Sequence, residues 1–422
     1  MARKMKDSGI EWIGEIPEGW SKNKVIRLFD IIGSGTTPKN ITSDFPVVNW
    51  IQSGDITGSF MPTCKNVISA NLLSQYSALK VYPAPFIIIA MYGASVGNAS
   101  ISLIDGCVNQ ACCVLSSPSC NLHYAFYVIK SAQSYLVRKA VGGGQPNISQ
   151  ETIKQLWLPL PPLSTQDIIV RNLDATCSKI DDLLSSVHAS IEEYKKLKQA
   201  VITLAVTKGV RGEREMKDSG VEWIGKVPSK WNCIKIKYLF EIRKRIAGKE
   251  GYTVLSITQT GIKPKNISSN EGQLADSYSN YQLLHFGEFA MNHMDLLTGW
   301  VDISNYNGVT SPDYRVFSLK DTITNHPRYF LYLMQMCYFN RIFYSMAQGV
   351  SSLGRWRLQS DKFLNCIFPV PSIEEQKEIS AYLDTTCSEI DKLIAKKEQL
   401  VKELESYKKS LIYEVVTGKR EV

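Results

Sequence analysis

The chain has 422 residues and a formal net charge of +8, with 44% hydrophobic and 21% charged residues. This length predicts two or three domains, and the composition excludes a disordered, collagen-like or purely coiled-coil protein. The longest apolar run, around Ala84 to Met91, is far shorter than the roughly 18 residues that a membrane helix needs, and the first 20 residues lack the apolar core of a signal peptide. We therefore expect a cytoplasmic protein that does not bind a membrane.

Ten cysteines are spread along the chain. The tightest group, Cys107, Cys112, Cys113 and Cys120 with His123, lacks the CxxC pairs that place two thiolates on one zinc ion. We expect reduced, buried thiols and no metal site.

The sequence contains an internal repeat. The segment Met5 to Trp20 (MKDSGIEWIGEIPEGW) recurs at Met216 to Trp231 (MKDSGVEWIGKVPSKW), and Leu158 to Leu184 recurs at Phe368 to Ile394. Each half therefore has the same order of parts: a short lead, a globular stretch, a proline-rich stop and a long helix. A repeat of this kind copies one structural unit and predicts an internal pseudo-two-fold. The expected divisions are two globular domains at 1–162 and 214–372 and two helical spacers at 163–213 and 373–422.

Both globular stretches are predicted to be mixed α/β. Short β-branched runs are bounded by Gly, Pro, Asn and Ser, which is typical of strands. The expected strands are Phe45 to Ile51, Pro85 to Ala90, Val108 to Leu115 and Tyr252 to Ile257, and the expected helices are Leu122 to Ala140 and Tyr329 to Met346.

The segments after the proline-rich stops have the heptad spacing of long amphipathic helices. Ser164 with Asp167, and Ser372 with Glu375, have the spacing of a capping box at the helix starts. The residues that mark these helices as the expected interface are Leu173, Ile180, Leu184, Ile191, Leu383, Ile390, Ile394 and Leu404.

A helix of more than 30 residues is about 50 Å long and cannot bury its apolar stripe against a small domain. The economical partner is the helix of the other repeat, in an antiparallel coiled coil. The alternative is that each helix packs only on its own domain.

The positive charge lies on the globular parts. Residues 1–162 and 214–372 carry net charges of +4 and +6, whereas 163–213 and 373–422 carry 0 and −2. A polyanion is therefore expected to meet the domains, and other proteins the helices.

Several predicted loops combine basic, amide and hydroxyl side chains with glycine, a mixture suited to phosphates and base edges. One is Gly33 to Lys39, and two others precede the proline-rich stops, while a basic triplet resembles a backbone clamp. The candidate DNA-binding residues in these segments are Ser34, Thr36, Thr37, Lys39, Gln145, Asn147, Arg243, Lys244, Arg245, Gln348, Ser351, Arg355 and Arg357.

No catalytic constellation is visible, since the sequence has no GxxxxGK[ST] phosphate loop and its five histidines show no metal-pair spacing. This favours a non-catalytic binding protein that lends specificity to enzymes made from other chains. Two alternatives stay open: a scaffold whose domains bind protein, and an enzyme with a fused methyltransferase function.

Several motifs together resemble the specificity subunits of type I restriction-modification systems. They are the MKDSG lead of each half, the GSGTTPK loop, the turn at Tyr92 to Gly97, the Val108-Asn109-Gln110 segment and the LP.PPL..Q..I...LD start of the first helix, with its counterpart in the second. The resemblance adds Tyr92 and Asn109 to the candidate DNA-binding residues. The loop has no visible counterpart in the second half.

This resemblance implies two target recognition domains, each reading one half of a bipartite DNA sequence, held apart by antiparallel helices. It implies no cofactor on this chain. Two modification subunits would bring S-adenosylmethionine to methylate adenine at N6, and restriction subunits would add ATP- and Mg-dependent translocation and cleavage.

Overall fold

The computed structural model describes residues 3–39, 41, 43–142, 144, 146–267, 275–347 and 356–422. Of the candidate residues, Gln145, Gln348, Ser351 and Arg355 lie outside this part of the chain. The chain divides into two compact units, residues 1–187 with 399–422, and residues 188–398. Each unit therefore combines one globular domain with parts of both long helices.

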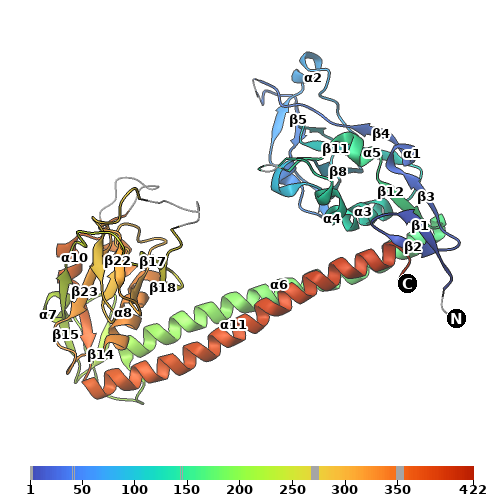
Figure 1. The fold of residues 1–422 in the computed structure, drawn as a ribbon. Helices are drawn as coiled ribbons and strands as arrows, with labels where there is room; N and C mark the ends of the chain where they lie inside the picture. Colours follow the sequence, from blue (N-terminus) through green and yellow to red (C-terminus); the bar gives the residue numbers. More distant parts are fainter. Residues whose placement is uncertain are drawn as a thin grey trace. The chain divides into compact units, whose positions relative to one another are not determined.

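The first globular domain is built on a mixed five-stranded sheet in the order β4-β11-β8-β9-β6, with helices α3 and α4 below it in the view of Figure 1. Its strands are β1 Met5–Ile10, β2 Gly14–Pro17, β3 Ser21–Lys24, β4 Phe29–Gly33, β5 Val47–Ile51, β6 Phe60–Met61, β7 Val67–Ser69, β8 Phe86–Ala90, β9 Ala99–Ser102, β10 Cys107–Val108, β11 Cys112–Pro118 and β12 Trp157–Leu160. Its helices are α1 Val25–Leu28, α2 Leu72–Gln75, α3 Leu122–Ser131, α4 Gln133–Arg138 and α5 Gln150–Lys154, with 3-10 turns at Ser53–Asp55 and Gly93–Ser95.

The second globular domain has a four-stranded sheet in the order β16-β23-β20-β21. Its strands are β13 Met216–Asp218, β14 Lys226–Pro228, β15 Asn232–Lys235, β16 Phe240–Arg243, β17 Leu255–Thr258, β18 Gly261–Pro264, β19 Gln282–Leu284, β20 Phe289–Met291, β21 Val301–Ile303, β22 Gly308–Thr310, β23 Arg315–Leu319 and β24 Ile367–Val370. Its helices are α7 Ile236–Leu239, α8 Pro327–Phe339, α9 Ile342–Ser345 and α10 Ser360–Asn365.

The two domains share one frame although their inner sequences differ. β4-β11-β8-β9 in the first sheet corresponds in order to β16-β23-β20-β21 in the second. In both domains a long apolar helix comes after the second strand of this order, α3 after β11 and α8 after β23, and most of its side chains are buried. The predicted mixed α/β class is therefore confirmed, and the repeat extends into the sheets.

The long helices predicted from heptad spacing are α6, Leu163–Lys208, and α11, Ile373–Val416. The start of α11 fits the capping prediction, since Ser372 precedes the helix and its Oγ accepts a hydrogen bond from the Glu375 N–H at 3.4 Å. The prediction for α6 is wrong. This helix begins at Leu163, and the carbonyl of Pro162 accepts from the N–H groups of Thr165 and Gln166, because Pro162 already occupies the position before the first helical residue.

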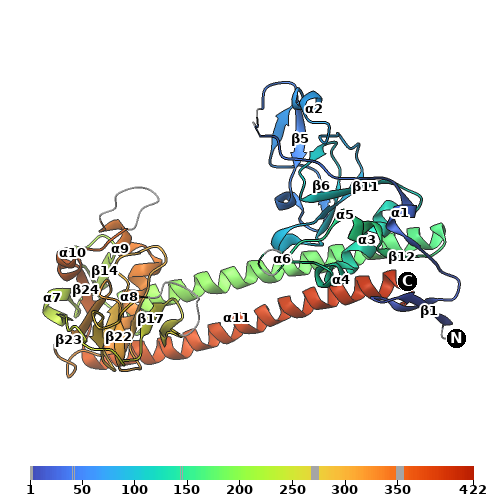
Figure 2. The same cartoon turned by 45° about the horizontal axis from the view of Figure 1, so that its top comes forward.

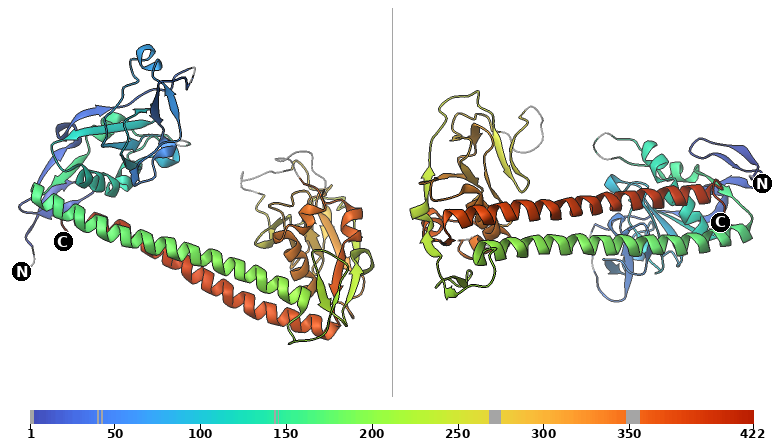
Figure 3. Two further views of the ribbon diagram at one scale, coloured as in Figure 1. Left: turned by 180° about the vertical axis from the view of Figure 1, so that it is seen from behind. Right: turned by 90° about the horizontal axis from the view of Figure 1, so that it is seen from below.

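In each unit the two helices run side by side and antiparallel (Figure 3). Lys408 of α11 pairs with Asp181 of α6 at 2.5 Å in one unit, and Lys198 of α6 pairs with Asp391 of α11 at 2.7 Å in the other. In each pair a lysine beside the apolar seam between the two helices contacts an aspartate of the neighbouring helix. The predicted antiparallel pairing is thus present within each unit.

Each domain also packs on both helices. In the first unit, Leu173 and Ile180 of α6 and Leu411 and Val415 of α11 join the core of the domain, and Figure 2 shows α3 and β12 close to α6. In the second unit the corresponding core contains Val206 with residues of α11 such as Leu383. Neither interpretation of the helices was complete by itself, because the same stripe serves the helix pair and the domain.

The MKDSG leads form hairpins that cover the ends of the long helices. β1 pairs with β2, and β13 with β14. In the first unit Lys419, just past α11, donates to the carbonyl of Ile13 at 2.8 Å, and in the second Lys208, the last residue of α6, donates to the carbonyl of Ile224 at 3.0 Å. The repeated lead therefore has a structural role at a helix end.

No helix in the described ranges is long and apolar enough to cross a membrane.

Candidate nucleic-acid interface

The loop Gly33 to Lys39 leaves β4 and lies firmly on the strands beside it. The Oγ of Ser34 donates to the carbonyl of Cys112 at 2.7 Å, and the Tyr82 hydroxyl donates to the carbonyl of Ser34 at 2.9 Å. A Cβ at Gly35 would overlap the main-chain oxygen of Val108. Glycine is needed here because two backbones approach closely.

The bond from Ser34 to Cys112 joins this loop to the start of β11, and main-chain hydrogen bonds join the segment before that strand to two further candidate segments. The N–H of Met91 donates to the carbonyl of Ala111 at 2.7 Å, and the N–H of Ile148 donates to the carbonyl of Met91 at 2.9 Å. The N–H of Gly93 donates to Pro146 at 2.9 Å, and Tyr92 forms a bridge with Asn147. Four segments that are distant in the sequence therefore form one continuous surface.

The candidate side chains on this surface differ in how they are presented. Thr37, Lys39, Tyr92 and Asn147 are exposed, and Thr36 is half-buried. The Ser34 hydroxyl is directed inward by its bond to Cys112. The Ser34 side chain therefore holds the loop in place.

The second domain has a topological counterpart of this loop, which sequence reasoning did not find. β16 ends at Arg243 where β4 ends at Gly33, and each strand is the edge neighbour of the corresponding central strand. The segment after β16 is held by Ala247, whose N–H donates to Tyr281 at 2.8 Å, and by Gly248, whose N–H donates to Ser279 at 2.9 Å. The sequence did not reveal this counterpart, because the two loops share a place in the fold but no sequence motif.

The basic triplet lies at this place, and two of its three residues are engaged within the domain. Arg243 lies 3.1 Å from Glu241 and donates to the Ser318 hydroxyl at 3.0 Å. Arg245 pairs with Glu288. Lys244, between them, is exposed. The domain therefore does not present three free cations in a row.

Arg357 stands beside two buried groups that sequence reasoning missed. The N–H of Leu358 donates to the carbonyl of His293 at 2.9 Å. Arg315 is 4% exposed, and its guanidinium donates to the carbonyl of Leu358 at 2.9 Å and lies 4.7 Å from the ring centre of Phe363. Arg315 thus holds the segment that carries Arg357, and no local motif marks it, because its role depends on contacts 43 residues away.

Burial controls the ionisation of this cluster. It lowers the pKa of Arg315 to about 10, with Arg357 adding to the effect, so the guanidinium stays charged at neutral pH. Burial, helped by Arg315 and Arg357, lowers the pKa of His293 to about 3, so its imidazole is neutral.

The helix residues chosen from the heptads all lie inward. Leu173, Ile180, Ile191, Leu383 and Ile390 are buried, and Leu184, Ile394 and Leu404 are half-buried. They lie in the seams between the helices, and several of them also join the domain cores. The exposed apolar side chains of these helices are different residues, among them Leu183, Leu197, Leu204, Leu393, Leu400 and Tyr407.

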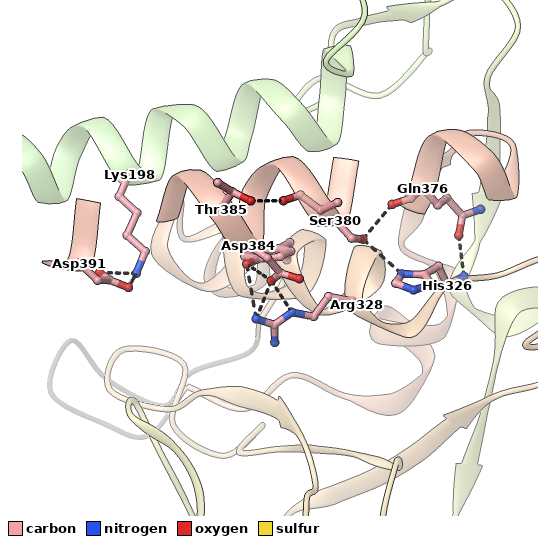
Figure 4. A network of polar contacts seen from close by, with 10 residues as sticks. Lys198, His326, Arg328, Gln376, Ser380, Asp384, Thr385 and Asp391 are labelled. Carbon is pink, nitrogen blue, oxygen red and sulfur yellow. Dashed lines mark hydrogen bonds and ion pairs between the residues drawn. The ribbon is translucent and has the colours of Figure 1, made fainter. Parts of the chain in front are cut away.

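A polar network joins the second domain to α11 (Figure 4). Gln376, fully buried, accepts from the N–H of His326 at 2.7 Å, and Ser380 lies 3.2 Å from the His326 ring. Two turns along α11, Asp384 accepts from Arg328 at 2.8 Å and from the hydroxyl of Tyr332 at 2.7 Å.

The first domain repeats half of this network. Gln166 accepts from the N–H of Asn121 at 2.9 Å, and Asp174 accepts from the Tyr127 hydroxyl at 2.6 Å. These contacts are paired by the repeat, which indicates that each domain is joined to its helix in the same way.

Comparison with known proteins agrees with this architecture. The family described as "Type I restriction modification DNA specificity domain" matches residues 17–193 and 228–403. The MjaVIII type I restriction enzyme specificity subunit of Methanocaldococcus jannaschii is 25% identical over 310 residues, covering 70% of this chain and 69% of the relative. The EcoBI specificity subunit of Escherichia coli is 21% identical over 399 residues, covering 86% and 82%.

A solved chain from a study of complex assembly and conformational transition of the type I R-M system has a similar fold, with a TM-score of 0.70 and 14% identity over 95% of this chain and 98% of that one. Two family matches, one in each half, cover the central sheet of each domain and most of the long helices. With its two domains on paired helices, the chain belongs to the family of type I restriction-modification specificity subunits.

Proposed function

We propose that this chain recognises a bipartite DNA target, with one half-site bound by each globular domain, and directs adenine N6 methylation and restriction by partner subunits. The observation that carries the proposal is the repeat itself: one sheet order occurs twice, with different loops on the same edge. A common frame with different loops suits two readings of one kind of ligand. The net charges of +4 and +6 on residues 1–162 and 214–372 suit a polyanion.

In this proposal the chain has no catalytic role. S-adenosylmethionine, ATP and Mg would be held by the modification and restriction subunits. Within the described residues no group of three or more His, Cys, Asp and Glu side chains could hold a metal ion.

The outward faces of the long helices suit helices of partner proteins. In the first unit Leu183, Leu400 and Tyr407 are 53%, 41% and 46% exposed, and in the second Leu197, Leu204 and Leu393 are 48%, 58% and 41% exposed. Leu183 corresponds to Leu393 in the repeat, and Leu197 to Tyr407. Because two of the three apolar positions in each unit are equivalent in the repeat, the proposal includes two copies of one partner, the modification subunit.

Two measurements test DNA recognition. Single-molecule mapping of methylated bases in host DNA, with and without the gene, should show a bipartite methyladenine motif that is lost on deletion. Binding of duplex DNA by the purified chain should fall steeply with salt, because binding releases cations condensed on the phosphates and this release becomes less favourable as the salt concentration rises. Salt-independent binding, or no motif lost, would favour a protein-binding scaffold instead.

Partner docking is tested by placing a charge in one apolar set. Leu197→Glu combined with Leu393→Glu should remove one of two modification subunits from the complex, measured as mass by light scattering. The control is Gln199→Glu, at an exposed residue of the helix that carries Leu197, and it should leave both subunits bound.

A further inference from the structure

We propose that Gln110 reads a base in the half-site of the first domain, and that Thr37 is the residue that positions its amide. This rests on the proposed function, because it assigns a role within DNA recognition. Gln110 was not among the candidate residues, whereas its neighbour Asn109 and the threonine were.

The main chain on both sides of Gln110 is fixed. It lies between β10 and β11, where the N–H of Asn109 donates to the carbonyl of Ile51 at 3.1 Å and the carbonyl of Ala111 accepts from Met91 at 2.7 Å. Gln110 is exposed, although its neighbours are half-buried. The backbone therefore presents this side chain outward from a rigid corner of the surface.

Asn109 is engaged in building that corner. Its Oδ1 accepts from the N–H of Ala111 at 3.2 Å, and its main-chain carbonyl accepts from the N–H of Cys112 at 3.2 Å. This is a local turn in which the asparagine side chain imitates a backbone carbonyl. The structure therefore places the turn-forming role on Asn109 and the exposed amide on Gln110.

Thr37 orients the Gln110 side chain from the neighbouring loop. Its hydroxyl donates to the Oε1 of Gln110 at 2.6 Å. Thr37 is itself held on both sides, by the close packing of Gly35 on Val108 and by the N–H of Lys39, which donates to the Tyr76 hydroxyl at 3.1 Å. The bond settles which end of the amide faces the loop and leaves the Nε2 hydrogens and a second lone pair of Oε1 for a ligand.

This remaining pattern, a donor beside an acceptor, matches the major-groove edge of adenine, which offers N7 as acceptor and the N6 amino group as donor. A side chain that is ordered before binding also loses less conformational entropy when it binds. The ligand assigned to Gln110 is therefore an adenine edge in the major groove, and Thr37 acts through Gln110 without contacting a phosphate.

The test selects bound sequences from a library of duplexes with randomised sequence, using the full chain and five variants. For Gln110→Ala, discrimination at one base position of one half-site should fall on the order of ten- to a hundredfold, and the other half-site should be unchanged. Thr37→Val should weaken discrimination at the same position, whereas Thr37→Ser, which keeps the hydroxyl, should not. Gln155→Ala, an exposed glutamine of the same domain outside this surface, should match the wild type.

A second substitution separates reading from folding. Gln110→Glu removes the donor and should shift the preference at that position toward cytosine, whose N4 amino group is a donor. An unchanged motif in Gln110→Ala and Gln110→Glu, or an equal loss of affinity for all sequences, would overturn the assignment. A wild-type chain that selects no motif would instead overturn the proposed function as a whole.

Discussion

The hydroxyl of Tyr329 in α8 lies 3.1 Å from the carbonyl of Val206 near the end of α6, and 2.8 Å from the carbonyl of Pro369, and donates a shared hydrogen bond to them. Tyr124 in α3 does the same with Val416 at 3.1 Å and Pro159 at 2.9 Å. In each unit one tyrosine thus joins a helix of the domain, the strand β12 or β24, and the end of a long helix. Both are fully buried.

Tyr329→Phe should lower the free energy of unfolding of the second unit by about 1–2 kcal/mol, because buried carbonyls lose their donor. Chemical denaturation followed by fluorescence measures this change. Tyr238→Phe, at a tyrosine that is 66% exposed, is the control and should change little. Equal stabilities of the two variants would show that the shared bond contributes nothing.

Glu375 is a buried carboxylate whose removal should be costly. It accepts from the Trp231 indole at 3.0 Å and pairs with Arg214 at 2.5 Å, with 6% of its side chain exposed. Glu375→Ala leaves a guanidinium and an indole N–H without this partner, and should destabilise the second unit by about 3 kcal/mol. Glu374→Ala, at the exposed neighbour, should cost less than about 0.5 kcal/mol. A thermal shift of similar size in both variants would contradict the prediction.

Substituting Lys408 and substituting its partner Asp181 should have different effects on stability. The Lys408 side chain is 17% exposed, whereas its partner Asp181 is 58% exposed. Asp181→Ala should lower the free energy of unfolding by up to about 1 kcal/mol at low salt and by less at high salt. Lys408→Leu should be neutral or stabilising, because an apolar side chain suits the seam.

The control for the lysine is Lys409→Leu, at an exposed position on the same helix, which should not stabilise. Strong destabilisation by Lys408→Leu would mean that the ion pair is needed to hold the two helices in register.

His293 should make stability depend on pH. Burial lowers its folded pKa to about 3, whereas the unfolded value is about 6.5. Between these values the unfolded chain binds a proton that the folded chain does not, so stability is complete above about pH 6.5 and falls as the pH falls, by at most about 1.4 kcal/mol per pH unit.

Urea denaturation between pH 7 and 4 should therefore give a shallower pH dependence for His293→Gln than for the wild type. His188→Gln, at an exposed histidine, should keep the wild-type dependence. Parallel curves for wild type and His293→Gln would show that this imidazole titrates normally.

The seams of the two helices could be predicted from residues such as Leu173 and Leu383 because heptad spacing is local and repeats many times. The same spacing could not show that Leu173 also enters a domain core, since one stripe fits either partner. The start of α6 was misplaced for a related reason: Ser164 has the right spacing for a cap, but Pro162 had already begun the helix.

Candidate residues of the first domain were predicted through the composition of one loop and a family resemblance, and Thr37, Lys39, Tyr92 and Asn147 do lie on one surface. Which of the two amides is exposed could not be predicted from the pair Asn109-Gln110, because both side chains can bond a base. A turn within the chain engages the first, and Thr37, from a loop far away in sequence, orients the second.

The repeat, the long helices, the mixed class and the charge of the domains can be predicted from the residues alone, because they depend on composition and on short periods along the chain. Which side chains of each domain face outward becomes visible only in the folded chain. That Arg243 donates to Ser318, that Arg245 is paired with Glu288, and that the second domain has a counterpart of the first loop all depend on contacts between distant segments. Such contacts are specified by sheet order and packing, which leave no mark in the local pattern of residues.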